Sequence, residues 1–358
     1  MAALDSPRQQ LLSSLQGRSL HIPDLRVIFQ HWPQAVSPEL DGLKQDLPAK
    51  MAMLTSSSKK LARMQKAEFA LFSACWWPTA ALERGKILTC LCMWLFIWDD
   101  EIDAEVGRLS GDLKASQRFR DETIGYVRYC LGLGNEACNP PENQIIAFFK
   151  VIGDAALEHC TLEQREIIMK EMEFFLDTSE IEQRRRLHEG LPSVEEYISC
   201  RMGTSAVGVT SAFNEFAYGT SPLPMHVMED TDMRALWDET NIIVWAVNDL
   251  LSLKKEIQQQ TVDSLIPLLY HKSGSLDLSV ALVVEAIEKA VRNFDRLAAA
   301  LMDRYGQDDG VVERLRCFIE ASQFNCTGNL AWSLRTGRYG VCQESIAGGV
   351  TVHLPQLG

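Results

Sequence analysis

Apolar residues recur along most of this chain at steps of three and four positions. The segment 280–301 is a plain example, because Ile287, Phe294 and Leu301 would lie on one stripe of a helix. Few segments show the strict apolar–polar alternation that is typical of strands. The pattern therefore predicts an all-α protein. Further helical segments are expected at about residues 60–77, 83–105, 117–133, 142–158, 163–178, 193–218, 230–258, 263–271 and 310–335.

Domain organisation follows from what separates these segments. Turn-forming residues break the helical pattern, as in Asn139-Pro140-Pro141. No shift in composition divides the chain, and no internal repeat is evident. We therefore expect one helical domain over residues 21–340. Residues 1–20 and 341–358 show weak periodicity, so we expect both ends to be flexible and to lie outside the core.

Composition narrows the class of function. The chain has 358 residues, of which 46% are hydrophobic and 23% charged, as is ordinary for a globular protein. A net charge of −13 with no basic run argues against nucleic acid as a partner. A polyanionic substrate would therefore have to be held by metal ions and a few placed cations. The longest apolar run, 87–98, is too short to span a bilayer of about 30 Å.

Cysteine and histidine usage points to a reducing compartment and away from zinc. The ten cysteines form no CxxC pair, which favours buried free thiols over a disulfide framework. The seven histidines form no pair at helical spacing. Residues 1–10 lack the basic-then-apolar order of a signal peptide. We therefore expect a cytoplasmic protein.

The first cluster of oxygen-bearing side chains, Asp99-Asp100-Glu101-Ile102-Asp103, directly follows the apolar run 87–98. Residues three or four positions apart share a helix face, so Asp103 would lie on the same side as Asp99 and Asp100. Most acidic clusters on helices simply face solvent. Here the preceding run should be buried, and carboxylates at the mouth of an apolar cavity are costly unless paired or metal-bound. We predict that Asp99, Asp100 and Asp103 bind metal.

The second cluster is a row of three different oxygen donors. Asn248, Ser252 and Glu256 would lie on one helix face and extend over about 12 Å at roughly 1.5 Å per residue. Such a set, without histidine or cysteine, is what Mg²⁺ prefers. Alternatively, Asn248 and Ser252 are satisfied core polar groups and Glu256 is solvated. The two clusters together favour a metal-dependent enzyme that acts on an anion.

These clusters resemble the aspartate-rich and NSE motifs of class I terpene synthases, in particular microbial and fungal sesquiterpene cyclases. Three further features agree with the resemblance. Arg201 stands 47 residues before Asn248, where this family keeps a diphosphate-sensing arginine. Arg338-Tyr339 matches the family's C-terminal Arg-Tyr pair, and Trp332 matches a pocket tryptophan. The resemblance covers about residues 20–340, and the DxDD motif of protonation-initiated cyclases is absent.

The resemblance implies a helical bundle around a central apolar cavity. It implies an isoprenyl diphosphate substrate, with farnesyl diphosphate the leading candidate, and a cofactor of three Mg²⁺ ions. Two ions would bind on the Asp99 side and the third at Asn248, Ser252 and Glu256. Diphosphate departure would leave a carbocation that cyclises to a sesquiterpene hydrocarbon or alcohol.

Further side chains receive roles from the resemblance and from their chemistry. The diphosphate-binding candidates are Arg201, Lys255, Arg338 and Tyr339, with surface salt bridges as the alternative role for the cations. Phe96 and Trp332 are the candidates for the pocket wall, where aromatic faces stabilise a cation. Four other aromatic residues are expected in the core: Trp76, Trp77, Phe175 and Phe216.

The segment 201–208 interrupts good helix with two glycines and small hydroxyl side chains. A helix break is therefore plausible here, because glycine in a helix costs about 1 kcal/mol relative to alanine. In the resembling family a backbone carbonyl at such a break faces the reacting carbon. This makes Thr204 and Ser205, together with Arg201, the catalytic candidates.

Three rival interpretations stay open at this point. A diterpene cyclase acting on geranylgeranyl diphosphate would carry the same motifs. A prenyl chain-elongating synthase would carry a second aspartate-rich motif where this chain has Asn248, Ser252 and Glu256. A non-catalytic helical scaffold would use the acidic clusters to bind a partner. The sequence does not distinguish a monomer from a homodimer, and it does not reveal the product.

Overall fold

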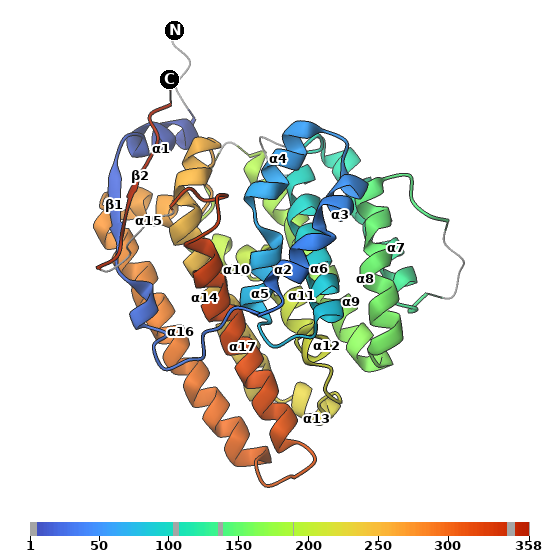
Figure 1. Ribbon diagram of the computed structural model, residues 1–358. Coiled ribbons are helices and arrows are strands. Elements are labelled where there is room, and N and C mark those ends of the chain that lie inside the picture. Colours follow the sequence, from blue (N-terminus) through green and yellow to red (C-terminus); the bar gives the residue numbers. More distant parts are fainter. Residues whose placement is uncertain (1–5, 103–106, 135–138, 189, 342–347, 358) are drawn as a thin grey trace.

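The computed structural model describes residues 6–102, 107–134, 139–188, 190–341 and 348–357. The chain is a bundle of helices with one small two-stranded sheet at its edge (Figure 1). The helices are α1 (Pro7–Leu15), η1 (Leu25–Val27), α2 (Leu40–Gln45), α3 (Leu47–Leu54), α4 (Ser58–Lys66), α5 (Phe69–Trp76), α6 (Leu82–Ile102), α7 (Leu113–Cys130), α8 (Gln144–His159), α9 (Leu162–Arg186), α10 (Val194–Thr204), α11 (Val207–Ala212), α12 (Asn214–Tyr218), α13 (Met225–Met228), α14 (Thr231–Gln258), α15 (Leu265–Ser273), α16 (Leu276–Tyr305) and α17 (Val312–Ser333). The strands are β1 (Ser19–Ile22) and β2 (Val350–His353).

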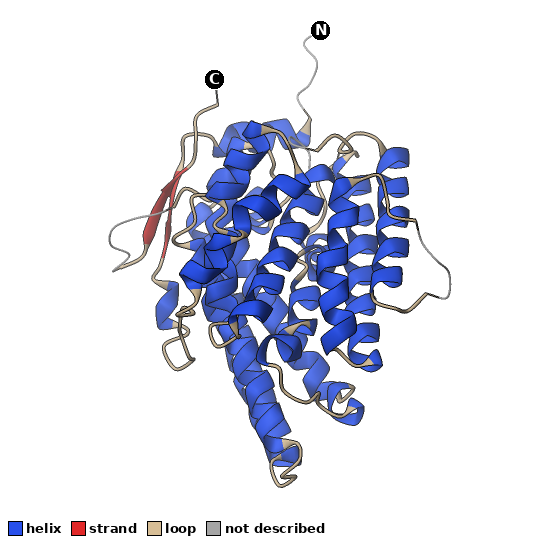
Figure 2. Cartoon of the chain, turned by 45° about the vertical axis from the view of Figure 1, so that its right-hand side comes forward, coloured by secondary structure: helices blue, strands red, loops and turns tan. Residues whose placement is uncertain are grey.

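The inner helices pack side by side in a ring. Helix α5 contacts α6 and α17, α17 contacts α14, α14 contacts α10 and α11, and these two contact α9. Helices α7 and α8 cover the outside of α6 and α9, and α16 covers α14 (Figure 1). Figure 2 shows from a second side that the two strands lie at the edge of the helical bundle. One continuous hydrophobic core runs through nearly all of these elements. The packing places α6 and α14, which carry the two predicted metal motifs, in the same ring.

Helix α6 is apolar on every side over most of its length, because it is buried on every side. Its tryptophans fix it against its neighbours. Trp94 Nε1 donates to the carbonyl of Ile145 at 2.7 Å, and Trp98 Nε1 donates to Thr123 Oγ1 at 2.9 Å. Satisfying both indole N–H groups removes the cost of burying them. The polar end of α6 is thereby held at a fixed position.

The two ends of the chain differ from the expectation that they lie outside the core. Strands β1 and β2 pair in antiparallel fashion, with Leu20 opposite Val352, and both of these side chains are buried. Helix α1 also buries three leucines. Four-residue strands are too short to show convincing alternation, and each strand's partner lies more than 300 positions away. Local pattern analysis therefore missed both.

Two expected segments are interrupted. The segment 60–77 forms α4 and α5, with Glu68 between them in the left-handed region at φ 51°. The segment 193–218 forms α10, α11 and α12, and the expected break falls at Ala206, at φ 57°. The eight cysteines in the described ranges are all free thiols. Within those ranges, no helix has the length and apolar character needed to cross a membrane.

Candidate active site

A cavity lies inside the ring of α5, α6, α9, α10, α11, α14 and α17. Its body is lined mainly by aromatic and aliphatic side chains, and its mouth by charged and amide side chains. Every predicted site residue in the described ranges lines this cavity, with the exception of Asp100. The predicted residues on its wall are Phe96, Asp99, Arg201, Thr204, Ser205, Asn248, Ser252, Lys255, Glu256, Trp332, Arg338 and Tyr339.

The row on α14 is connected by hydrogen bonds. Ser252 Oγ donates to one carboxylate oxygen of Glu256, and Ser264 Oγ donates to the other at 2.6 Å. Asn248 Oδ1 accepts from Arg201 Nη2 at 2.8 Å, and its Nδ2 donates to Tyr339 Oη at 2.5 Å. The α14 row therefore meets two of the predicted diphosphate-binding residues.

These donors fit a divalent cation. Burial raises the pKa of Glu256 first of all, and the neighbouring Asp249 raises it further, against the effect of the two serine hydroxyls. Lys255 acts in the opposite direction and favours the ionised form, which a cation at the mouth of the cavity would stabilise further. Among the described residues, no group of three His, Cys, Asp or Glu side chains is assembled for metal binding. At the α14 row, Asn248 and Ser252 would supply amide and hydroxyl oxygens beside the Glu256 carboxylate.

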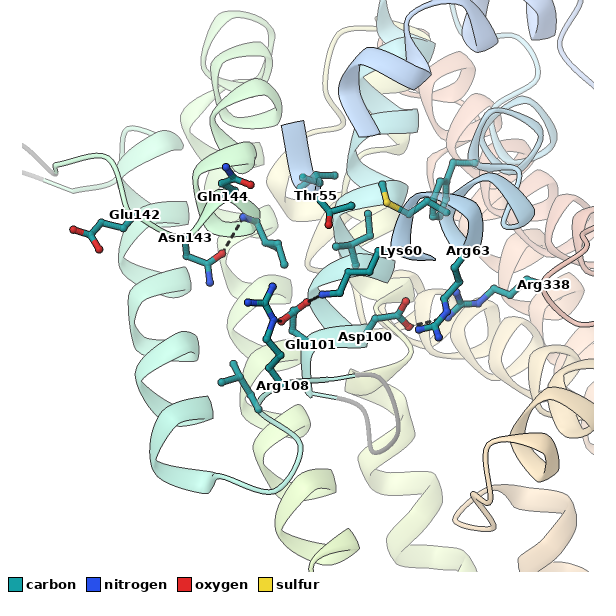
Figure 3. A pocket seen from close by; sticks show the side chains of 16 residues that line it. Thr55, Lys60, Arg63, Asp100, Glu101, Arg108, Glu142, Asn143, Gln144 and Arg338 are labelled. Carbon is teal, nitrogen blue, oxygen red and sulfur yellow. Dashed lines mark hydrogen bonds and ion pairs between the residues drawn. The ribbon is translucent and has the colours of Figure 1, made fainter. Parts of the chain in front are cut away.

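The two aspartates at the end of α6 face different spaces. Asp99 is half-buried and lines the main cavity. Asp100 lines an adjoining cavity, where its Oδ1 accepts from Arg338 Nη2 at 3.2 Å (Figure 3). Asp103 lies outside the described residues. Arg338 lines both cavities and so links the aspartate end of α6 to the main cavity.

Arg201 is held by two residues that the sequence analysis missed. Asp249 is fully buried, and its carboxylate lies 3.3 Å from Arg201 Nη2 and accepts from Tyr197 Oη at 2.5 Å. Burial alone would lower the pKa of Arg201, but the pair of Tyr197 and Asp249, whose negative charge lies on the Asp249 carboxylate, outweighs burial and raises the pKa. Arg201 therefore stays charged at the cavity mouth. The available signals were the adjacency of Asp249 to Asn248 and the one-turn spacing from Tyr197 to Arg201.

Aromatic side chains connect the mouth of the cavity to its body. The guanidinium carbon of Arg338 lies 4.9 Å from the ring centroid of Phe96. The Trp332 ring packs edge-on against Phe72, Phe96 and Tyr339. Burial raises the pKa of Tyr339 to about 12, so that its hydroxyl remains a neutral hydrogen-bonding group.

Two aromatic residues expected in the core also form the cavity wall. Trp76 and Phe175 are almost completely buried and line the cavity. Trp77 and Phe216 do not line it, and Trp77 Nε1 donates instead to Asn214 Oδ1 at 2.8 Å. Aromatic residues that line the cavity and aromatic residues of the core occur at the same helical spacing in the sequence. The sequence pattern alone therefore does not distinguish the two positions.

The helix break between α10 and α11 borders the cavity at Thr204 and Ser205. Ser205 Oγ donates to Asn241 Oδ1 at 2.7 Å, and Asn241 Nδ2 donates to the Met202 carbonyl at 2.6 Å. Thr204 Oγ1 is buried and has no hydrogen-bond partner among the described residues. Asn241, which the sequence analysis also missed, fixes the two sides of the break to α14.

The fold and the site together define a class I terpene synthase, and comparison with known structures agrees. A linalool/nerolidol synthase from Streptomyces clavuligerus, solved with 2-fluorogeranyl diphosphate, superposes with a TM-score of 0.72 at 17% identity and covers 83% of this chain and 99% of its own. Hedycaryol synthase, solved in complex with nerolidol, gives a TM-score of 0.69 at 20% identity, with coverage of 84% and 96%. At these identities the likeness establishes the fold.

Sequence comparison establishes the family. Residues 90–293 match the family model described as terpene synthase family 2, C-terminal metal binding. The sesquiterpene cyclase hepA of Aspergillus oryzae is 35% identical over 345 residues, which is 94% of this chain and 93% of hepA. Terpene cyclase braA of Annulohypoxylon truncatum is 25% identical, with coverage of 94% and 91%. This chain belongs to the terpene synthase family.

Proposed function

We propose that this enzyme is a Mg²⁺-dependent sesquiterpene cyclase that acts on farnesyl diphosphate. The observation that carries the proposal is the division of one cavity into a polar mouth and an aromatic body. The mouth offers oxygen donors for metal and cations for a diphosphate. The body is lined with aromatic side chains, and this apolar surface suits a hydrocarbon chain. The sesquiterpene cyclase hepA, similar over nearly the whole chain, supports a fifteen-carbon substrate.

We assign the metal-binding role to Asp99, Asp100 and Asp103 on one side. On the other side we assign it to Asn248, Ser252 and Glu256. Bound Mg²⁺, in the proposed number of three ions, would neutralise charge on the departing diphosphate. The geometry of the α14 row supports the second set, because its three oxygen donors border one cavity mouth.

The chain's own cations would orient the diphosphate. Arg201 and Arg338 both line the cavity and can each form bidentate hydrogen bonds to phosphate oxygens. Lys255 and the Tyr339 hydroxyl border the same space. Positive charge placed in advance stabilises the negative charge that develops when the allylic C–O bond breaks. No protein nucleophile is needed for that step.

The aromatic body would protect the resulting carbocation. Phe96, Trp332 and Trp76 line it, and each aromatic face can stabilise a nearby cation by about 0.5–2 kcal/mol when water is excluded. The break beside Thr204 and Ser205 is proposed to direct a backbone carbonyl at the reacting carbon. Rings and carbonyl oxygens lower the energy of the cation without forming a bond to it.

The decisive experiment is incubation of the purified protein with geranyl, farnesyl and geranylgeranyl diphosphate and Mg²⁺, followed by mass spectrometry of the volatile products. Cyclic C15 products from farnesyl diphosphate are expected. Cyclic C20 products alone would make the enzyme a diterpene cyclase, and elongated prenyl diphosphates would make it a chain-elongating synthase. If no product forms and Mg²⁺ plus diphosphate causes no thermal shift, the result would favour the interpretation as a non-catalytic helical scaffold.

The cellular setting is part of the proposal. Of the described cysteines, seven are buried, and burial raises the pKa of Cys75, for example, to about 11, so its thiol stays protonated and unreactive. Free thiols throughout the described ranges support a reducing compartment, and we assign the enzyme to the cytoplasm.

A further inference from the structure

A second cavity adjoins the active-site cavity beneath α3 and α4 (Figure 3). Asp100 and Glu101 of α6 line it from below, and Lys60 and Arg63 of α4 line it from above. Arg338 borders this space and the main cavity alike. The two cavities therefore meet at the Arg338 side chain.

The carboxylates of this second cavity near α4 already have cationic partners. Glu101 is buried and forms an ion pair with Lys60, and Arg108 Nε lies 3.8 Å from its other oxygen. The Asp100 carboxylate accepts from Arg338 at 3.2 Å. Each of these two carboxylates therefore already lies beside at least one cationic side chain.

Arg63 is a further cation in the lining of this cavity. Its side chain is half-buried, and it forms no hydrogen bond or ion pair with any residue that the structure describes. In Figure 3 the side chains of Arg63 and Arg338 point toward each other beside Asp100. Two guanidinium groups thus share the surroundings of one carboxylate, in a protein whose net charge is −13. Among the described residues, the whole lining of this cavity carries four cations (Lys60, Arg63, Arg108 and Arg338) and three carboxylates (Asp100, Glu101 and Glu142), and the single positive charge in excess favours an anion.

The position of Arg63 is fixed by the segment that carries Arg338. Trp332 Nε1 donates to the Ala67 carbonyl at 2.8 Å, directly after the end of α4. Thr336 Oγ1 donates to the Lys66 carbonyl at 3.1 Å and accepts from the Arg338 backbone N–H at 3.2 Å. The end of α4 and the approach to Arg338 therefore form one hydrogen-bonded unit, which keeps the two arginines together.

We propose that Arg63 binds the diphosphate group of the substrate together with Arg338, so that the anion site extends beneath α4. The inference rests on the proposed function, because it assigns a further residue to the same anion. A guanidinium group matches phosphate oxygens in geometry and charge, and a diphosphate has enough oxygens to contact several cations at once. Helix α4 would then contribute a residue that binds the substrate, in addition to packing over the site.

The test compares two variants that each remove one positive charge from α4. Arg63→Gln removes the side chain in the second cavity, and Lys59→Gln removes an exposed one that lines neither cavity. Binding of inorganic diphosphate in the presence of Mg²⁺ is measured by calorimetry. Arg63→Gln is expected to weaken binding about tenfold, the loss of one charged hydrogen bond, and Lys59→Gln less than about twofold. Equal affinities of the two variants would overturn the inference.

Two further measurements keep the result interpretable. Arg63→Lys retains the charge without the bidentate geometry and should fall between the wild type and Arg63→Gln; wild-type affinity in both would also overturn the inference. If the wild type binds diphosphate and cyclises farnesyl diphosphate while Arg63→Gln matches Lys59→Gln, only the role of Arg63 fails. If the wild type neither binds diphosphate nor forms product, the proposed function fails, and the role of Arg63 fails with it.

Discussion

At the scale of single residues, the half-buried carboxyl of Glu256 is expected to give the site a pH dependence. Its pKa is raised by burial and by Asp249, and the Mg²⁺ proposed to bind there would bind only the ionised form. Mg²⁺ affinity in the presence of diphosphate should therefore begin to fall at a higher pH than the ordinary glutamate pKa of about 4.3 would give. Calorimetry across a pH series measures this.

In the metal-free protein, the free energy of unfolding should change with pH in the opposite direction to the Mg²⁺ affinity. A carboxyl whose folded pKa lies above its unfolded pKa holds its proton more tightly in the folded state. The free energy of unfolding should therefore rise as the pH falls through the folded pKa of Glu256. Glu256→Gln should abolish both the Mg²⁺ response and this pH effect, whereas Glu285→Gln, at an exposed position on α16, should preserve them. A Mg²⁺ response that survives in Glu256→Gln would contradict its assignment as a ligand.

Replacing Asp249 is predicted to lower the free energy of unfolding of the protein, even without substrate. Asp249→Asn keeps the shape of the side chain but leaves Arg201 without its buried counter-charge. Breaking a buried pair in this way costs about 3–5 kcal/mol in the free energy of unfolding. Asp238→Asn, exposed on the same helix, should cost less than about 0.5 kcal/mol. Denaturant unfolding of the two variants decides the matter, and equal midpoints would refute the prediction.

At the scale of elements, the break between α10 and α11 is held by Asn241. Asn241→Ala would leave the Ser205 hydroxyl and the Met202 carbonyl without this partner. We expect a broader set of terpene products, with diphosphate affinity within about twofold of the wild type, because the hydrogen bonds to Asn241 position the break and do not contact the anion. Thr240→Val is the control, since the Thr240 hydroxyl bonds only within its own helix, to Leu236. An unchanged product profile in Asn241→Ala would remove this role.

The elements also show how far sequence reasoning reaches. Spacing within one helix is local, so the rows on α6 and α14 could be predicted, as could the break near Ala206. Tyr197, Asp249 and Arg63 gain their significance from helices that meet only after folding. Nothing in the pattern near Arg63 distinguishes it from a solvated lysine or arginine.

At the scale of the whole molecule, the sheet of β1 and β2 ties the two ends of the chain together. Alternate residues of β2 are buried and exposed, which gives a matched pair of variants. Val352→Asp would place a charge against the core and should lower the free energy of unfolding by more than about 3 kcal/mol. Thr351→Asp, on the exposed side, should change it by less than about 0.5 kcal/mol. Similar thermal midpoints for both would show that the sheet contributes little.

The place of Arg338 and Tyr339 near the end of the chain has a consequence for biosynthesis. A ribosome releases α6 and α14 long before these two residues, and β2 later still. A nascent chain can therefore form α6 and α14 before the two residues proposed to bind diphosphate have been added. On the proposed function, ionisation of the substrate would have to wait until the segment with Arg338 and Tyr339 has been translated and has packed against the end of α4.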